Sequence, residues 1–301
     1  MTTSRLRRGI ALAAAASVAL GLAACSSGSD DAGSDGDLGT ITLGYIPSWT
    51  DGLSTAYLLQ DQLEKIGYDV EMKELTEAAP LYTGLANGDV DIYPSAWPEV
   101  THAAYMKKYG DDIEDLDTYY DNAKLTIAVP SYTDIDSIDE LAGNAKKFDG
   151  KIYGIEPGAG LTGVTKDSMM PEYGLDGDYE LVTSSTAAML TELQKAIDDK
   201  KDIVVTLWTP FWANSSFDVK TLKDPKGAMG ESEGLHFLAT KGFSDEFPEA
   251  ADYIKNIKLD DDQYGSLEDT VVNQYDKGEE ADAIDAWLAK NPKAYTGILE
   301  D

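Results

Sequence analysis

The chain has 301 residues, with 55 acidic and 24 basic side chains and a formal net charge of −31. This balance argues against a nucleic-acid partner, because such partners need clusters of Lys and Arg. It also argues against the folded body lying on an anionic membrane surface. We attribute most of the charge to a solvated acidic surface, whose field would also attract cationic ligands.

Residues 1–24 are predicted to form an export signal. Three arginines precede an apolar run from Ile10 to Ala24, which is too short to span a bilayer comfortably. Leu22 stands three residues before Cys25, where an ordinary secretory cleavage site needs a small residue. The sequence from Leu22 to Cys25 instead resembles the bacterial lipoprotein box. That resemblance implies that Cys25 becomes the lipidated first residue of the mature chain.

The segment after the signal is predicted to be a flexible tether over residues 25–38. It has no apolar side chain larger than alanine between Ser26 and Asp37, and it cannot support a packed core. Cys25 is the only cysteine, so no disulfide competes for it. We therefore expect an exported body held by lipid alone at the outer face of the cytoplasmic membrane, or in a periplasm where an outer membrane exists.

Strand and helix patterns alternate from Ile41 onward, which predicts an α/β fold. Strands are expected from 41 and at 70–75, 90–92, 125–129, 151–156, 203–207 and 235–240. Helices are expected at 53–66, 79–86, 187–198, 248–257, 263–278 and 281–289. The order predicts two lobes with a cleft between them. Lobe I comprises 39–129 and 235–301, and lobe II is inserted as 130–234.

Three tryptophans follow short apolar runs that are typical of strands. Trp49 and Trp97 stand after the runs that begin at Ile41 and Val90, and Trp208 ends the run from Ile203. Ligands of α/β proteins bind beyond the carboxyl ends of strands, and aromatic boxes hold quaternary ammonium ions by cation–π attraction. The alternative is that all three belong to the core. Trp287, on the apolar face of a helix, is predicted to be a core residue.

A glycine-rich turn from Gly158 to Gly163 matches G-x-G-x-x-G after a predicted strand. A nicotinamide cofactor is a poor match for an exported lipoprotein, but the physics of the motif is general. Glycines let backbone N–H groups approach an anion, and the following helix N-terminus favours negative charge. The turn is interpreted as a carboxylate-binding turn, with a purely structural turn as the alternative.

The sequence offers little support for metal, cofactor or catalytic chemistry. His102 and His236 are the only histidines, so we expect no metal site and no cofactor. Asp260 to Asp262 lack the spacing of a calcium loop and are expected to cap the following helix. No G-x-S-x-G motif occurs, and no carboxylate pair stands out as that of a glycosidase. We expect a binding protein rather than an enzyme.

Together these segments resemble the glycine betaine/quaternary-amine binding proteins of ABC importers, which have the type II periplasmic-binding fold. The resemblance runs from about residue 40 to 289. It implies that Trp49, Trp97 and Trp208 build a box around a trimethylammonium group, and that the backbone amides of Gly160 and Leu161 hold the ligand's carboxylate. His102 matches a position at the rim of that site, with a surface histidine as the alternative.

The chain departs from the family pattern at several positions. Leu207 replaces a glycine, Phe211 replaces a histidine, and Pro98-Glu99 places a carboxylate close to the expected box. Glycine betaine is the expected ligand because it carries both an ammonium group and a carboxylate, and choline, carnitine and proline betaine are the alternatives. The resemblance implies an ABC permease as partner for a monomeric protein that serves osmolyte uptake. The rival interpretations are an exported sugar-active enzyme and a lipoprotein with a structural or adhesive role.

Overall fold

The computed structural model describes residues 38–292 of the chain, all within the unit Asp37–Asp301. The proposed signal, the lipidated Cys25 and the tether up to residue 37 lie outside the described residues. Within the described range, no helix is both long and apolar enough to cross a bilayer.

Five strands form a first sheet in the order β2-β1-β3-β9-β4. β1 is parallel to β2 and β3, whereas β9 is antiparallel to both β3 and β4. The strands are β1 (Thr40–Tyr45), β2 (Asp69–Glu74), β3 (Ile92–Ala96), β4 (Ile113–Pro130) and β9 (Glu233–Thr240).

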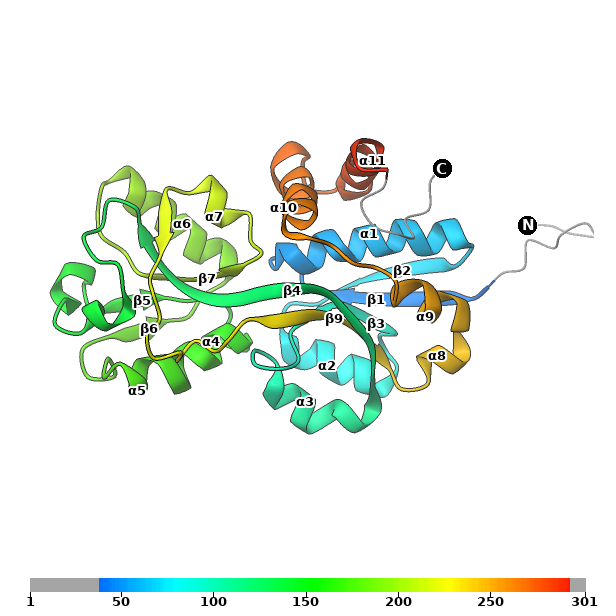
Figure 1. The fold of residues 1–301 in the computed structure, drawn as a ribbon, viewed down its shortest axis with the longest axis horizontal. Helices are drawn as coiled ribbons and strands as arrows, with labels where there is room; N and C mark the ends of the chain where they lie inside the picture. The colour runs from blue at the N-terminus through cyan, green and yellow to red at the C-terminus, as the bar shows by residue number, and fades with distance from the viewer. Residues whose placement is uncertain (1–37, 293–301) are drawn as a thin grey trace, which may run out of the picture. The chain divides into compact units, whose positions relative to one another are not determined.

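A second sheet continues from the far end of β4, which pairs with β9 up to Ala123 and with β7 from Lys124 onward. Figure 1 shows this long strand, in green, passing through both sheets. The order is β4-β7-β5-β6, with β8 also paired to β4. The added strands are β5 (Lys151–Tyr153), β6 (Glu180–Val182), β7 (Val205–Thr209) and β8 (Val219–Thr221).

The helices divide between the two sheets, and the predicted two-lobed α/β fold is confirmed. In the first lobe α1 packs against β3, α10 and α11. Its helices are α1 (Thr50–Ile66), α2 (Ala78–Asn87), α3 (Ala103–Tyr109), η1 (Gly110–Asp112), α8 (Phe243–Glu246), α9 (Pro248–Ile254), α10 (Asp261–Asp269), η5 (Thr270–Gln274) and α11 (Glu280–Lys290). Those of the second are η2 (Ile138–Leu141), η3 (Ala145–Phe148), α4 (Gly160–Val164), η4 (Thr165–Met169), α5 (Met170–Glu172), α6 (Thr186–Asp198) and α7 (Ala213–Ser216).

Local signals predicted several elements correctly. α1 ends at Gly67, which adopts the left-handed conformation that favours glycine. Asp260 caps α10 in a capping box with Gln263, as expected for the aspartate run. Trp287 is 1% exposed and donates its indole N–H to Ser266 Oγ at 2.9 Å, so its assignment to the core is confirmed.

Other boundaries were wrong, and each error has a physical cause. The strand predicted at 125–129 is the end of the 18-residue β4, whose first part mixes exposed acidic residues with buried Leu116, Tyr119 and Tyr120 and so lacks a continuous apolar run. The helix predicted at 263–278 ends as α10 and passes into a π-helical turn, η5. The strand predicted at 90–92 begins only at Ile92, after the left-handed Gly88 has closed α2.

Candidate functional site

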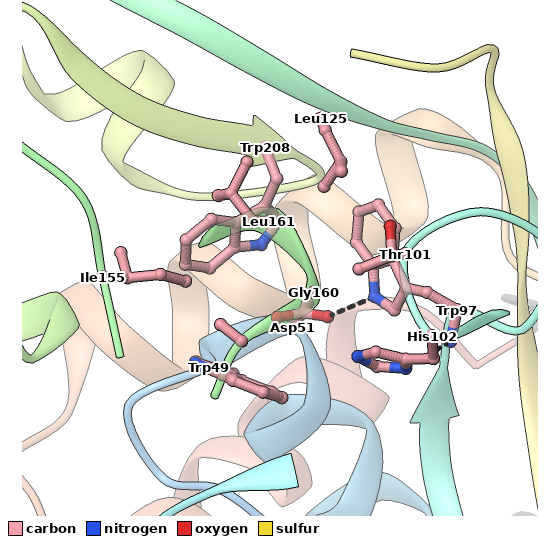
Figure 2. Close-up of a pocket in the computed structure, with 11 residues that line it drawn as sticks. Trp49, Asp51, Trp97, Thr101, His102, Leu125, Ile155, Gly160, Leu161 and Trp208 are labelled. Atoms are coloured by element: carbon pink, nitrogen blue, oxygen red, sulfur yellow. Dashed lines mark hydrogen bonds between the residues drawn. The ribbon is translucent and has the colours of Figure 1, made fainter. Parts of the chain in front are cut away.

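A pocket lies where the ends of the two sheets meet, and its empty space is about 340 Å³. Figure 2 shows the side chains around it. The lining residues are Trp49, Asp51, Trp97, Thr101, His102, Leu125, Ile155, Ala159, Gly160, Leu161 and Trp208. The structure thus brings together all six residues that the sequence predicted for ligand binding.

The three tryptophans reach the pocket from three different elements (Figure 2). Trp49 is the N-cap residue of α1, and Trp97 directly follows β3. Trp208 was expected just past a strand but lies inside β7, where it is paired with Leu125 of β4. The strand is displaced by two residues from the prediction because β4 holds it in register as far as Thr209.

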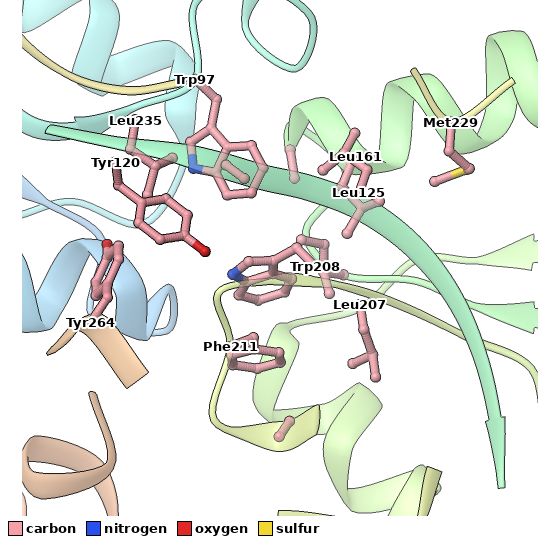
Figure 3. Close-up of a cluster of buried hydrophobic side chains, with 14 of the residues drawn as sticks. Trp97, Tyr120, Leu125, Leu161, Leu207, Trp208, Phe211, Met229, Leu235 and Tyr264 are labelled. Carbon is pink, nitrogen blue, oxygen red and sulfur yellow. The ribbon is translucent and has the colours of Figure 1, made fainter. Parts of the chain in front are cut away.

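Phe211, which replaces the histidine expected from the family resemblance, supports the box rather than lining it. Its ring stacks on Trp208 with centroids 3.8 Å apart and an interplanar angle of 11°. Figure 3 shows this stacked pair within the apolar cluster that includes Leu125 and Leu161. The stack covers one face of the Trp208 indole and restricts its rotation, since two flat rings in contact move together.

The glycine-rich turn opens a continuous helical segment that starts with α4 at Gly160 and runs through η4 and α5. Amides in the first turn of a helix have no acceptor within the helix, so those of Gly160 and Leu161 are suited to an anion in the pocket. Gly160 is required by close packing rather than by a positive φ. A Cβ there would lie 2.0 Å from the carbonyl oxygen of Thr101 in the first lobe.

His102 lines the pocket, but it is a buried residue and not a surface histidine. Its side chain is 2% exposed, and Nδ1 accepts a hydrogen bond from the backbone N–H of Trp97 at 3.2 Å. Its ring lies nearly parallel to Trp49, with centroids 6.2 Å apart. Burial lowers the pKa of His102 to about 3, so the imidazole is neutral at physiological pH and puts no positive charge beside a cationic ligand.

Asp51 is the functional candidate that the sequence analysis missed. It stands in the first turn of α1, two residues after Trp49, and its 4% exposed side chain lines the pocket. Oδ2 accepts from Ser95 Oγ at 2.9 Å and from Trp97 Nε1 at 3.4 Å. Burial raises the pKa of Asp51, while these hydrogen bonds oppose the rise. The sequence did contain a signal for this residue, since an acidic side chain stands at the start of a helix that begins beside a box tryptophan.

Glu99, the carboxylate expected near the box, faces another partner. Its Oε1 lies 2.9 Å from Nε2 of His236, whose Nδ1 is 2.9 Å from Asp115. Burial tends to lower the pKa of His236, but the two carboxylates outweigh it and raise the pKa. Glu99 is therefore not among the residues that line the pocket, because its side chain pairs with His236 of β9.

In residues 38–292, no group of three or more His, Cys, Asp and Glu side chains is arranged to hold a metal ion. The pocket combines aromatic faces, backbone donors and one buried carboxylate. Such a site can bind a small organic ion between two lobes. The fold and the site together define a two-lobed protein that binds a small ligand between its lobes.

Comparison with known proteins identifies the family. Residues 39–290 match the model of the substrate binding domain of ABC-type glycine betaine transport systems, and the chain belongs to this family. The glycine/betaine/L-proline-binding protein ProX from Borrelia burgdorferi superposes with a TM-score of 0.80 and 31% identity, covering 87% of this chain and 97% of that one. Lactococcal OpuAC, in a closed complex with glycine betaine, gives a TM-score of 0.78 and 32% identity over 85% and 97%.

Two further similar proteins carry other ligands in their names. A choline binding protein in complex with choline gives a TM-score of 0.74 and 27% identity, covering 84% of this chain and 89% of that one. The glycine betaine/carnitine transport binding protein GbuC of Listeria monocytogenes is 37% identical over 142 residues. That alignment spans 47% of this chain and 46% of GbuC, so the chain matches about half the length of this relative.

Proposed function

We propose that this protein captures glycine betaine, or a closely similar zwitterionic quaternary ammonium compound, outside the cytoplasm and delivers it to an ABC permease. The observation that carries the proposal is the convergence of three tryptophans and the first two residues of α4, Gly160 and Leu161, on one cavity. The indoles would hold the trimethylammonium group, and the amides would hold the carboxylate. Lobe I (39–129 and 235–301) and lobe II (130–234) would close on the ligand by a hinge motion.

The energies of these contacts are sufficient for useful affinity. Three cation–π contacts at about 0.5–2 kcal/mol each give roughly 2–6 kcal/mol. Micromolar binding requires about 8 kcal/mol. Two hydrogen bonds to a carboxylate, at about 1.5–3 kcal/mol each, can supply the difference. A ligand that has both groups should therefore bind more tightly than one that has only the ammonium group.

Titration calorimetry with glycine betaine and choline under matched salt tests the proposal. We expect choline to bind more weakly by about 2–4 kcal/mol, because it leaves two buried donors without an anion. Binding of choline at equal or higher affinity would contradict the assignment of the amides to a carboxylate. Binding of oligosaccharides, with no response to either ammonium compound, would favour a sugar-active protein.

Choline is the second candidate, and Asp51 is the observation that favours it. An ionised carboxylate in the pocket attracts a ligand with net positive charge and repels a second carboxylate. Replacing Asp51 with asparagine separates the two ligands. If choline is the ligand, the substitution should weaken its binding about tenfold or more, whereas glycine betaine should bind as well as before or better.

Loss of a box tryptophan should reduce ligand affinity as well as stability, whereas loss of a core tryptophan away from the pocket should reduce stability alone. We expect Trp208→Ala to weaken glycine betaine binding by about 1–2 kcal/mol or more, with Trp208→Phe milder because it retains a π face. Trp287→Ala is the matched control, since its indole is buried away from the pocket among α10 and α11. It should lower the free energy of unfolding by about 3–5 kcal/mol and leave the affinity of the folded protein unchanged. Calorimetry and thermal melts distinguish these outcomes.

Lipid attachment through Cys25 is the proposed means of holding the protein at the membrane. Cys25→Ala should release the protein into the soluble fraction after export, because one acyl-modified residue carries the whole anchor. The thermal melt of the released protein should equal that of the body cleaved from its anchor. Tight membrane association of this variant after a high-salt wash would place the anchor elsewhere in the chain.

A further inference from the structure

Glu156 lies two residues before the glycine-rich turn and is held by donors from both lobes. Its side chain is 6% exposed. Oε1 accepts from Ser48 Oγ at 3.1 Å and from the Thr186 backbone N–H at 3.0 Å. Oε2 accepts from Trp49 Nε1 at 3.2 Å and from Thr186 Oγ1 at 2.9 Å. Each oxygen thus has one partner in each lobe.

The two pairs of donors differ in how they would respond to opening. Thr186 begins α6, in the same lobe as Glu156, and would stay with it. Ser48 and Trp49 follow β1 in the first lobe and would move away. A buried carboxylate that loses donors is destabilised, although water can replace them once the lobes separate. The interlobe bonds therefore favour the closed arrangement.

The contact with Trp49 also affects the box itself. An indole has a single N–H donor, at the edge of the ring, so a bond from that edge to Glu156 limits rotation of the ring. Trp49 is the least buried of the three box tryptophans, being partly exposed where Trp97 and Trp208 are 5% and 4% exposed. Because packing confines it less completely, the bond to Glu156 contributes more to its orientation than such a bond would for a fully buried ring.

Neighbouring contacts show that the loop of Glu156 forms part of a tight interface between the lobes. Tyr105 of the first lobe donates its hydroxyl to the carbonyl of Gly158 at 2.9 Å. A Cβ on Gly158 would lie 2.5 Å from Oε2 of Glu77, also in the first lobe. This interface lies beside the pocket, and Glu156 is not among the residues that line it.

We propose that Glu156 is a positioning residue that couples closure of the two lobes to the orientation of Trp49, and so slows ligand release without contacting the ligand. The inference rests on the proposed function for the identity of the ligand. Because Glu156 acts through Trp49 and Ser48, its removal should affect the retention of glycine betaine and choline to the same degree. Residues in the pocket should instead change the ratio of the two affinities.

The test compares three variants by stopped-flow tryptophan fluorescence with glycine betaine and choline. Glu156→Gln replaces one accepting oxygen with an amide NH₂ and should raise the dissociation rate at least about tenfold for whichever ligands the parent binds. The association rate should change little. Ser48→Ala removes one interlobe donor and should raise the dissociation rate severalfold. In the double variant, the dissociation rate should rise by less than the product of the two single-variant increases. Thr186→Val removes an intralobe donor and should leave the rate near that of the parent.

Small-angle scattering provides a second readout that needs no knowledge of the ligand. Without added ligand, Glu156→Gln should shift the population toward the open form relative to the parent. Unchanged dissociation rates in both Glu156→Gln and Ser48→Ala would overturn the inference and leave Glu156 as an anchor of α6. If the parent binds neither ammonium compound, the proposed function fails, and scattering decides the coupling: an unshifted Glu156→Gln profile overturns it.

Discussion

Replacing Gly160 with valine should reduce the affinity for glycine betaine by about 100-fold or more. The first atom of any side chain at this position would lie 2.0 Å from the carbonyl oxygen of Thr101 and 2.6 Å from its Cγ2. Backbone cannot be displaced as a flexible side chain can, so the two lobes would have to stop short of their closed arrangement. The ligand would then lose the two amide bonds from the turn, worth about 3–6 kcal/mol together. Titration calorimetry measures the loss.

The unliganded protein should tolerate the same substitution, because the collision occurs only between the lobes. Gly163→Ala is the matched control on the same helical segment, since a Cβ there meets no atom within 4 Å. It should leave the affinity unchanged. Leu161→Ala should also be mild, because the backbone donor survives a change of side chain. Normal binding by Gly160→Val would contradict the proposal that the closed contact with Thr101 is required.

Replacing Glu268 with glutamine should make the stability of the folded state less sensitive to a rise in pH from about 4.5 to 8. Glu268 of α10 is 1% exposed and accepts hydrogen bonds from the hydroxyl of Thr50 and the backbone of Trp212. Burial raises the pKa of this carboxyl from 4.5 to about 8, and the charge of Asp51 adds to the rise. The folded state therefore keeps a proton that the unfolded chain has already released at neutral pH.

The direction in which stability changes with pH follows from this difference in the number of bound protons. The parent should lose free energy of unfolding as pH rises from about 4.5 toward 8, since the unfolded state binds fewer protons over that window. At about 1.4 kcal/mol for each pH unit, the loss is on the order of 5 kcal/mol. Glu268→Gln lacks the ionisation, so its advantage over the parent should grow across the window. Urea denaturation at a series of pH values measures it.

An exposed glutamate, Glu246, controls for the removal of one negative charge. Glu246→Gln should follow the parent at every pH. If the stability of Glu268→Gln also equals that of the parent at every pH, then ionisation of Glu268 does not destabilise the fold. Burial beside Thr50 would then not control its protonation.

Much of the fold was predictable because its signals are local. Gly67 closes α1 through a left-handed conformation that glycine adopts readily, and Asp260 caps α10 with its own side chain. The alternation of strand and helix indicated the α/β fold. The glycines of 158–163 and the run of small residues around them indicated a turn that opens a helix, which is where α4 begins.

The sequence by itself also determined which side chains could form the candidate site. Trp49, Trp97 and Trp208 follow or end strands, and their positions along the chain require only that the strand ends meet. The resemblance to quaternary-amine binding proteins added the roles of Gly160 and Leu161. These site residues could be predicted because each belongs to a short segment whose residue types indicate its role without knowledge of its distant neighbours.

The tertiary structure alone decided the contacts between residues far apart in the chain. Glu99 could be placed near the box by sequence, but its pairing with His236 joins positions 137 residues apart. Glu156 meets Trp49 across 107 residues, and Gly160 meets Thr101 between lobes. No local pattern encodes such pairs, because their geometry depends on how β4 crosses from one sheet to the other. For the same reason Asp51, an ordinary helix-start aspartate by sequence, becomes a buried carboxylate in the pocket only when Ser95 and Trp97 close over it.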